Sequence, residues 1–378
     1  MARSTTSIPL GRVFGIPVRM SWSVVVVSVI GSWIVATDVF PRVDSELALR
    51  WRLGLAAGGV LFFLGSILAH EFGHALAARR HGIQTSSIRL WIFGGVAALS
   101  RPARTPAAEF QIAVAGPGTN AVLAALFLSI AALSRRLAAP DELALVATGL
   151  AILNLLLTAT NLVPAAPLDG GRVLSSILWA RTGRPEWARL ISARIGLIVG
   201  LLIVGYGFIE VVAWDRISGV YTSAIGVFIV AAARADVISA SIRGRLARTS
   251  VNDVLWQYPP AVHDAVSLSD LERRLGSETV SVPVQRWAHQ TIGYLSTSIL
   301  SVIPPDHHSW TSAGEVMTPT EFVPAAWTSE SLLTALERIG PEPDQILGVD
   351  PETGAIVGTA TPRQFAHLMV EPRLWGGV

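Results

Sequence analysis

A metal-binding motif lies inside a segment that is apolar enough to cross a membrane. Residues 70–74 read His-Glu-Phe-Gly-His, within the otherwise apolar run Leu53–Ala78. Histidines four residues apart lie on one face of a helix, so His70 and His74 can bind one zinc ion while Glu71 acts as a general base. Ionisable groups at bilayer depth are costly and mark functional sites. The alternative is a chance match on a buried helix of a soluble protein, and the remaining sequence discriminates between the two.

The composition is that of a membrane protein with a soluble part. Hydrophobic residues make up 51% of the 378 residues and charged residues only 15%, whereas soluble domains contain about 25% charged residues. The length allows two domains. Because the chain has no cysteine, metal ligands must be His, Asp or Glu. The small net charge of +2 gives no indication of a nucleic-acid partner.

Six apolar segments reach the roughly 20 residues that a helix needs to span a bilayer. They are Met20–Phe40, Leu53–Ala78, Ala107–Leu133, Leu143–Leu162, Leu190–Ala213 and Gly219–Ile238. Residues 1–19 are polar and lack the apolar core and cleavage site of a signal peptide. The sequence therefore predicts an α-helical, polytopic membrane domain of about six transmembrane helices.

A shorter apolar segment, Ile88–Leu99, is rich in β-forming residues and is interrupted by Gly94 and Gly95. It is too short to span the bilayer and predicts a re-entrant β-hairpin. Irregular backbone at such depth is tolerated only where it is buried in protein or lines a wet cavity. Since a hairpin edge can pair with an unwound peptide, Gly94 and Gly95 are candidate substrate-supporting residues.

The arginines predict the orientation of the membrane domain. With the N-terminus inside, most arginines between the segments fall on the cytoplasmic side. The outer side receives only Arg42, Arg50, Arg52, Arg135, Arg136 and Arg216. The positive-inside rule favours this arrangement. We therefore expect a multi-pass protein of the cell membrane with a cytoplasmic N-terminus, and His70 about 13 Å along its helix from the cytoplasmic edge at Arg79.

A catalytic zinc site needs a third protein ligand beside the two histidines. The candidate is Asp169, in the run Asn161–Arg172, which follows the fourth apolar segment and contains two prolines and two glycines. These residues interrupt the helix, and the topology brings Asp169 to the depth of His70 and His74. The alternative is a solvent-exposed loop in which Asp169 caps the next helix.

Three motifs in this order resemble the site-2 protease family, the M50-type intramembrane zinc metalloproteases. The first is the HExxH motif in the second segment, and the second is Gly-x-x-x-Asn from Gly116 to Asn120 in the third. The last is Asn-Leu-Val-Pro-x-x-Pro-Leu-Asp-Gly-Gly-Arg, from Asn161 to Arg172. The resemblance covers the whole membrane part.

The resemblance implies an intramembrane zinc metalloendopeptidase that cleaves a transmembrane helix of a membrane-anchored substrate. It implies a zinc ion held by His70, His74 and Asp169, with Glu71 as the base that activates water. It also assigns support of the substrate or the transition state to two asparagines, Asn120 and Asn161. The implied partner is a membrane-embedded protein, such as an anti-sigma factor or the precursor of a membrane-bound regulator, within the lipid bilayer.

From about Gly244 the composition becomes polar enough for a soluble domain, so we predict a membrane domain of residues 1–243 and a cytoplasmic domain of residues 244–378. The second domain contains a loose duplication, with copies that begin near Ser250 and Ala313. Each copy reads as an entry segment, a short helix, two strands and a helix, which predicts an α/β module used twice.

This duplication resembles the tandem CBS pair that one subgroup of the site-2 protease family carries. Nucleotide-binding CBS motifs end a Gly-h-h-Ser/Thr-x-x-Asp run with an acid that holds the ribose. Here Ile299 and Gln364 stand at the two corresponding positions. This departure argues against nucleotide binding and leaves a structural role, including contact within a homodimer, as the alternative.

A membrane transporter or channel regulated by a CBS pair is the alternative function, because intramembrane charges also mark ion pathways. The hypothesis of a transporter or channel does not explain why the metalloprotease motifs occur in this order. An inactive relative that acts as a scaffold is disfavoured because every catalytic position is filled.

Overall fold

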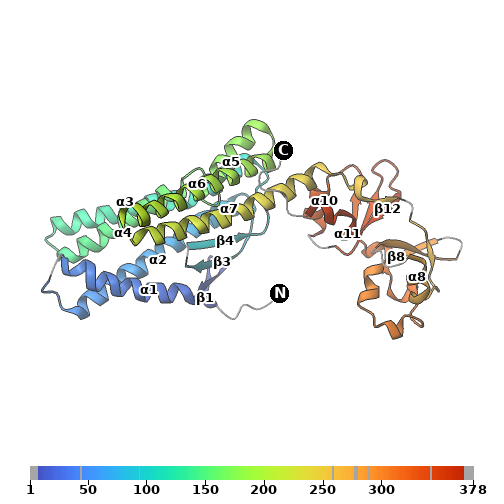
Figure 1. Ribbon diagram of the computed structural model, residues 1–378, viewed down its shortest axis with the longest axis horizontal. Coiled ribbons are helices and arrows are strands. Elements are labelled where there is room, and N and C mark those ends of the chain that lie inside the picture. Colours follow the sequence, from blue (N-terminus) through green and yellow to red (C-terminus); the bar gives the residue numbers. More distant parts are fainter. Residues whose placement is uncertain are drawn as a thin grey trace. The chain divides into compact units, whose positions relative to one another are not determined.

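The computed structural model describes residues 7–42, 45–92, 94–257, 259–275, 280–287, 290–340 and 343–369 (Figure 1). The chain divides into two compact units, Met1–Val237 and Ile238–Val378. Helix α7 (Ser218–Arg248) continues both across this division and across the predicted domain boundary after Arg243. The exact domain limits therefore stay a prediction.

The first unit is built from long apolar helices. Six helical segments are long and apolar enough to cross a membrane, which confirms the predicted class of membrane part. They are α1 (Trp22–Ile34) with its continuation to Arg42, α2 (Leu49–Arg80), α3 (Pro106–Arg136), α4 (Asp141–Asn161), α6 (Pro185–Trp214) and α7. A shorter helix, α5 (Asp169–Thr182), lies between α4 and α6.

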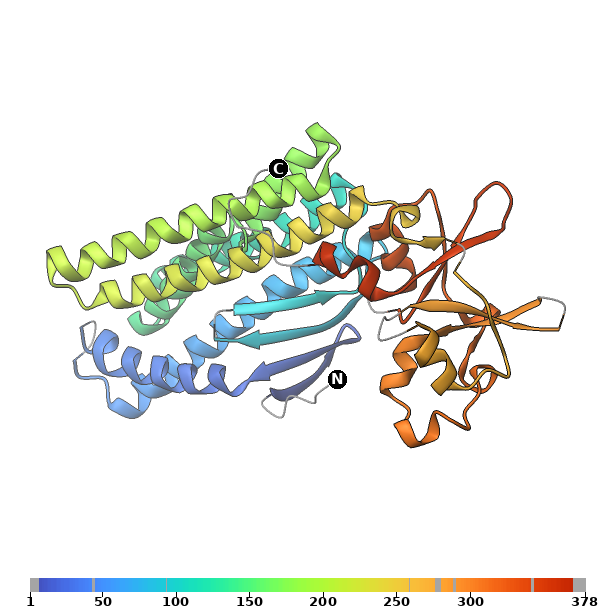
Figure 2. The same ribbon diagram turned by 45° about the vertical axis from the view of Figure 1, so that its right-hand side comes forward.

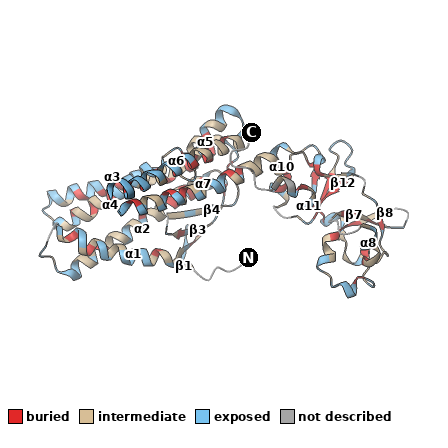
Figure 3. Ribbon diagram, viewed as in Figure 1, coloured by how far each residue is buried: buried red, intermediate tan, exposed pale blue. Residues whose placement is uncertain are grey.

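The outward faces of these helices are apolar rather than polar. Large hydrophobic side chains such as Val29, Phe62, Val122 and Leu202 are more than half exposed, on helices α1, α2, α3 and α6. Figure 3 shows long exposed and half-buried stretches along these helices. A soluble protein does not expose so much contiguous apolar surface, whereas a bilayer solvates it.

Helix α3 packs against α2, α4 and α5 and so lies at the centre of the elements that carry the predicted ligands. Its contact with α2 is close because Gly73 has no side chain. A Cβ atom at Gly73 would lie 2.6 Å from Thr119 Oγ1 and 2.7 Å from the carbonyl oxygen of Ala115. Small residues at such contacts let helix backbones approach each other in membranes.

A four-stranded sheet lies beside α2 (Figure 2). Its strands are β1 (Ser7–Val13), β2 (Ile16–Ser21), β3 (Thr85–Trp91) and β4 (Gly94–Leu99), in the order β1-β2-β3-β4. Strands β1 and β2 are antiparallel, β2 and β3 are parallel, and β3 and β4 form an antiparallel hairpin. Because β4 is an edge strand, its outer backbone groups are free to pair with an added strand.

The predicted hairpin at Ile88–Leu99 is thus half of a larger sheet, and its residue 93 lies outside the described residues. Sequence reasoning missed β1 and β2. The signal was the alternation in β2, where Ile16 and Val18 are buried against Phe72 and Ile88. For the same reason the first span begins at Trp22 rather than at Met20, since Met20 belongs to β2.

The second unit contains two sheets of matching topology, which bears out the predicted duplication. The first has β6 (Val262–His263), β7 (Ser281–Arg286), β8 (Gln290–Ser296) and β9 (Thr318–Pro319), with α8 (Leu268–Leu275) between β6 and β7. The second has β10 (Ala325–Trp327), β11 (Ile346–Val349), β12 (Ile356–Ala360) and β5 (Trp256–Gln257), with α10 (Leu332–Ile339) between β10 and β11. Each sheet has one parallel pair followed by two antiparallel pairs.

The two copies exchange their entry strands. Strand β5 precedes the first copy but pairs with β12 of the second, and β9 precedes the second copy but pairs with β8 of the first. Buried hydrogen bonds also join the copies: Gln345 Oε1 accepts from Ser281 Oγ at 2.6 Å, and the carbonyl of Ser281 accepts from Thr359 Oγ1 at 2.7 Å. The duplication therefore forms one body rather than two independent domains.

The close approach of α2 and α3 can be tested with a single methyl group. We expect Gly73→Ala to lower the free energy of unfolding by about 1–3 kcal/mol, because the added Cβ meets backbone that cannot move freely. Thermal unfolding of the detergent-solubilised protein measures the effect. Gly65→Ala on the same helix is the control, since no atom lies within 4 Å of its Cβ position; equal stability of the two variants would contradict the close packing.

Candidate metal centre

Helix α2 places three ionisable side chains on its buried surface. His70, Glu71 and His74 are 7%, 6% and 5% exposed. The helix continues without interruption through the motif, so the i, i+4 spacing brings the two imidazole rings together with Nε2 atoms 3.1 Å apart. The predicted pair of ligands is therefore preorganised by regular helix geometry.

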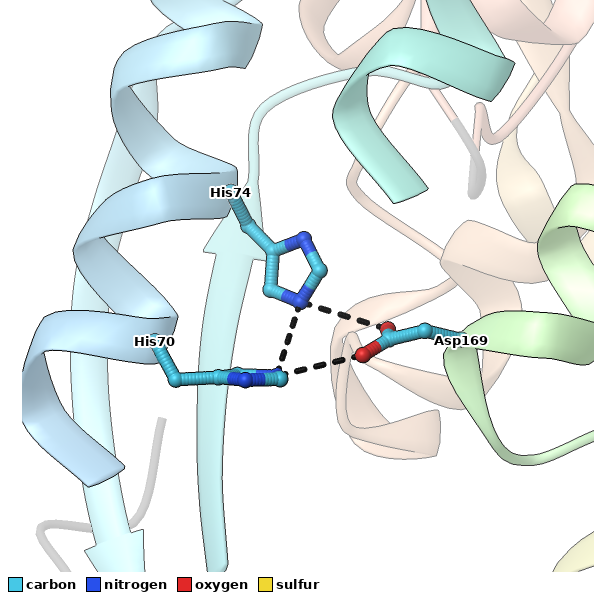
Figure 4. A group of neighbouring side chains, drawn as sticks. All are labelled: His70, His74 and Asp169. Atoms are coloured by element: carbon cyan, nitrogen blue, oxygen red, sulfur yellow. Dashed lines mark hydrogen bonds and ion pairs between the residues drawn. The ribbon is translucent and has the colours of Figure 1, made fainter. Parts of the chain in front are cut away.

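Asp169 is the first residue of α5, and its side chain points at the two histidines (Figure 4). Its Oδ2 lies 3.1 Å from His70 Nε2, and its Oδ1 lies 3.2 Å from His74 Nε2. Gly170 and Gly171 permit this position, because a Cβ atom at either would collide with the backbone of the segment that follows α4. The carboxylate does not cap its own helix, so the alternative of a solvent-exposed capping residue is wrong for the described structure.

The geometry of the three residues fits a tetrahedral zinc site. Ligand atoms 2.0–2.1 Å from zinc at tetrahedral angles lie about 3.3 Å from one another, close to the separations of 3.1–3.2 Å found here. Among the described residues, these three form the group of ionisable side chains whose ligand atoms lie within 4.8 Å of one another. Two imidazoles and one carboxylate are the three protein donors of a catalytic zinc site, in which the fourth position is left to water or substrate.

Asp169 lies outside the six spanning helices, and its surroundings favour the carboxylate form. Burial by itself would raise the pKa of Asp169, but the hydrogen bonds with His70 and His74 outweigh it and hold the pKa well below its ordinary value. A carboxyl group must be deprotonated to bind a metal cation, and the lowered pKa keeps Asp169 in that form.

Neighbouring groups orient the ligands. His74 Nδ1 lies 2.7 Å from the carbonyl oxygen of Ile112, so it donates its proton there and leaves Nε2 free for a metal. Arg172 Nε lies 2.9 Å from Glu109 Oε1, which ties the first turn of α5 to the start of α3. His70 Nδ1 is buried without a hydrogen-bond partner. Both ligand-bearing helices, α2 and α5, are therefore held by contacts with α3.

Glycines make room for the reactive groups. A Cβ atom at Gly116 of α3 would lie 2.6 Å from His70 Nε2, and one at Gly95 of β4 would lie 2.6 Å from Glu71 Oε1. The backbone of Ala97 also hydrogen-bonds to the Glu71 carboxylate. The edge strand β4 thus lies directly against the predicted general base, which the sequence alone did not indicate.

The other predicted residues differ in their surroundings. Asn120 is fully buried one helical turn after Gly116, and both of its side-chain amide atoms lack a partner. Asn161 is half-buried at the end of α4 and, in the described part of the chain, makes no hydrogen bond with the ligands. Gly94, at a φ of +133°, has open space around its Cβ position.

Asn154 on α4 was missed by sequence reasoning. It is fully buried, donates to Ser66 Oγ at 3.1 Å and to the carbonyl of Leu150 at 2.8 Å, and keeps an unpaired Oδ1. Its place in the middle of an apolar span was the available signal, because polar side chains at bilayer depth are expensive. It ties α4 to α2 within the bundle.

Comparison with known proteins identifies the family. The model of peptidase family M50 matches residues 58–148 and 136–203. The putative zinc metalloprotease Rip3 of Mycobacterium tuberculosis is 38% identical over 371 residues, covering 97% of this chain and 94% of the relative. A putative zinc metalloprotease of Synechocystis, sll0528, is 28% identical over 362 residues, covering 93% of this chain and 92% of the relative.

Two solved structures align with portions of the chain. The site-2 protease from Methanocaldococcus jannaschii aligns with a TM-score of 0.41 and 23% identity, covering 61% of this chain and 95% of that one. The CBS domain of a bacterial CNNM/CorC family Mg²⁺ transporter aligns with a TM-score of 0.28 and 19% identity, covering 37% of this chain and 86% of that one.

The apolar spans and the buried group of three candidate metal ligands are those of a multi-pass membrane metallopeptidase. With a relative 38% identical over nearly its entire length, the chain belongs to peptidase family M50, the site-2 protease family that its motifs resemble.

The space around the ligands can be tested at Gly116. We expect Gly116→Ala to lower zinc affinity by at least tenfold, because its Cβ would displace the Nε2 atoms that the metal needs. Zinc competition with a chromophoric chelator measures the affinity. Gly118→Ala on the same helix has no atom within 4 Å of its Cβ position and should bind zinc as the wild type does; an equal loss in both variants would refute the role of Gly116.

Proposed function

We propose that this chain is an intramembrane zinc endopeptidase that cleaves a transmembrane segment of a membrane-anchored protein. In this proposal, His70, His74 and Asp169 hold zinc and Glu71 is the general base. The observation that carries it is the convergence of the three ligand atoms at a buried point beside Glu71, on a helix long and apolar enough to span a membrane. Similarity to relatives named zinc metalloproteases supports the choice of metal.

The residues divide the chemistry among them. A zinc ion at this site would supply a Lewis acid that makes water nucleophilic near neutral pH. The Glu71 carboxylate accepts the proton from the attacking water and passes it to the leaving amine. Glu71 directly follows the proposed ligand His70 in α2, and the backbone of Ala97 hydrogen-bonds to its carboxylate. Asn120, buried with an unpaired amide close to Gly116, is suited to donate to an oxyanion.

The substrate reaches the base by pairing with β4. A peptide in a transmembrane helix hides its amides in hydrogen bonds, so it must unwind before cleavage. The edge strand β4 offers backbone partners for the unwound segment, beside Glu71. Gly94 and Gly95 keep the start of this strand free of side chains, and Asn161 supports the substrate near the end of α4.

The site is close to the cytoplasmic surface, and the N-terminus and the C-terminal unit are cytoplasmic. The distribution of arginines supports this orientation. A short distance to the cytoplasm allows water to reach a site within the bilayer. Substrates of the proposed kind are membrane-embedded regulators such as anti-sigma factors, whose cleavage releases a soluble product.

The C-terminal CBS-like unit tunes the activity without supplying chemistry, since every proposed ligand lies upstream of it. The positions that hold a ribose-binding acid in nucleotide-binding CBS motifs have other uses here. Ile299 packs against the apolar core of the first copy, and Gln364 caps the helix Pro362–Phe365. These roles support structural stabilisation or dimerisation rather than nucleotide sensing.

A CBS-regulated transporter or channel is the weaker alternative. It accounts for the intramembrane charges but not for three ligands at zinc spacing with a base beside them. Membership in a peptidase family also favours proteolysis.

Because Glu71 is proposed as the base and not as a ligand, replacing it should abolish cleavage without affecting zinc binding. We expect Glu71→Gln to lower cleavage of a membrane substrate by at least about 10²-fold, because the amide cannot accept the proton. Zinc content and thermal stability should stay at wild-type values, since no ligand is removed. Cleavage at an undiminished rate would exclude Glu71 as the base.

Asp169 is expected to be required for both metal and activity. Asp169→Ala leaves two histidines, which is too few for a stable catalytic site. Metal analysis of the purified protein should show loss of most of the zinc, with cleavage abolished. Asp141→Ala is the control because Asp141 also begins a helix but lies apart from the ligand cluster. One zinc per chain in Asp169→Ala would mean that another residue is the third ligand.

A further inference from the structure

The sheet of the first unit has two faces of different character. Ile16, Val18 and Ile88 are buried against α2. On the opposite face, called here the open face, Arg19 of β2 and Arg89 of β3 are partners in register, so their side chains lie next to each other. Both are exposed, and within the described residues neither forms an ion pair or a side-chain hydrogen bond.

Two like charges side by side on a sheet are destabilising unless something compensates for them. Acidic residues are absent from β1, β2, β3 and β4, all of whose residues are described. The strand pairing adds a further cation, because Arg12 of β1 is in register with Pro17, two residues before Arg19. The open face therefore carries concentrated positive charge with no acidic residue on its own strands.

A cavity of about 500 Å³ lies on this face beside Arg89. Its lining consists of Ser7, Ser21, Ser87, Arg89, Trp91, Val96 and Ala98. Three hydroxyl groups and a guanidinium are donors for an anion, and charge-assisted hydrogen bonds are the stronger ones. The Oγ of Ser7 is buried without a partner, so the cavity holds an unsatisfied polar atom that a ligand would satisfy.

The start of α1 adds to the positive potential. Ser21 lines the cavity and is also the N-cap of α1, where its side chain accepts from the backbone N–H of Ser23. The N-terminal end of a helix carries a partial positive charge and attracts anions. The guanidinium, the hydroxyl groups and the helix end therefore converge on one polar cavity.

The position of the cavity relates it to the membrane surface. The first span begins at Trp22, directly after Ser21, so the cavity adjoins the start of this span, the part of a spanning helix that meets the headgroup region. Trp22 is 58% exposed there, as expected for an aromatic side chain in the headgroup region. Phosphate groups of lipids occupy the same level.

We propose that this cavity binds the phosphate of an anionic phospholipid headgroup, with Arg89 as the principal contact and Arg19 as the adjacent cation. The serine hydroxyls donate to the remaining phosphate oxygens, and exposed Val96 contacts the first methylene groups of the acyl chains. An acidic peptide is the less fitting ligand, because a carboxylate has only two oxygens to meet this number of donors. Anchoring at this site would fix the sheet at the membrane surface.

The test uses the purified full-length protein in neutral detergent with phosphatidylcholine, titrated with phosphatidylglycerol. Native mass spectrometry counts retained phosphatidylglycerol, and thermal unfolding measures the stabilisation. We expect Arg89→Gln to weaken phosphatidylglycerol binding about tenfold, as for the loss of a charge-assisted hydrogen bond. Arg80→Gln is the matched control: it removes one exposed arginine at the end of α2, away from the sheet, and should bind as the wild type does.

Ser7→Ala keeps the test decisive if Arg89→Gln does not fold. It removes the unpaired hydroxyl without disturbing a hydrogen bond, and we expect about fivefold weaker binding. Equal affinity of wild type and both variants, or an equal loss in Arg80→Gln, would overturn the site.

Two further titrations distinguish the source of the anion. Inorganic phosphate at millimolar concentration should neither stabilise the protein nor displace phosphatidylglycerol; stabilisation by phosphate alone equal to that by the lipid would overturn the lipid assignment. An acidic peptide that displaces the lipid from both the wild type and Arg80→Gln, and binds more tightly than the lipid, would show that the face recognises protein instead. Unchanged zinc content in all variants establishes that the effects are local.

Discussion

The contact between the Asp169 carboxylate and the imidazoles of His70 and His74 is the interaction on which the rest of the structure depends. It joins two helices that are far apart in the sequence, at separations of 3.1 and 3.2 Å in a buried environment. Three ionisable groups removed from water are costly unless they are mutually satisfied or bind a cation. The surrounding elements are packed to accommodate this cluster. Helix α3 approaches α2 closely at Gly73, and the missing side chain of Gly116 leaves the space that the Nε2 atoms of the histidines fill.

The sheet links the proposed metal site to the strand that we propose binds the substrate. Its inner face packs on α2 through Ile16, Val18 and Ile88, which positions the edge strand β4 against Glu71. One strand therefore supplies both a hydrogen bond to the proposed base and free backbone groups for a peptide. The open face carries Arg19 and Arg89, which have no ion-pair partner among the described residues, beside a polar cavity. A small sheet at the start of the first span thus links the proposed reaction site with the proposed lipid site.

Much of this organisation could be predicted because it follows from local patterns. Apolar runs of sufficient length indicate spans whatever their partners, and the i, i+4 spacing of His70 and His74 fixes their common face. The internal duplication was visible in the order of its motifs, and the structure has the matching topology. Strands β1 and β2 were missed, since the alternation in β2 spans only a few residues with glycines and prolines nearby, and its pairing with β3 is a long-range contact.

The sequence by itself determined the class of the protein: six apolar helices, a motif suited to zinc, a candidate third ligand and a repeated soluble module. Only the tertiary structure decided that the carboxylate of Asp169 meets both histidines, that Glu71 lies against β4, and that Arg19 and Arg89 are neighbours. The physical reason is that helix periodicity and hydropathy act over a few residues of one segment. Ligand distances, edge strands and unpaired charges depend instead on how segments separated by tens of residues pack together.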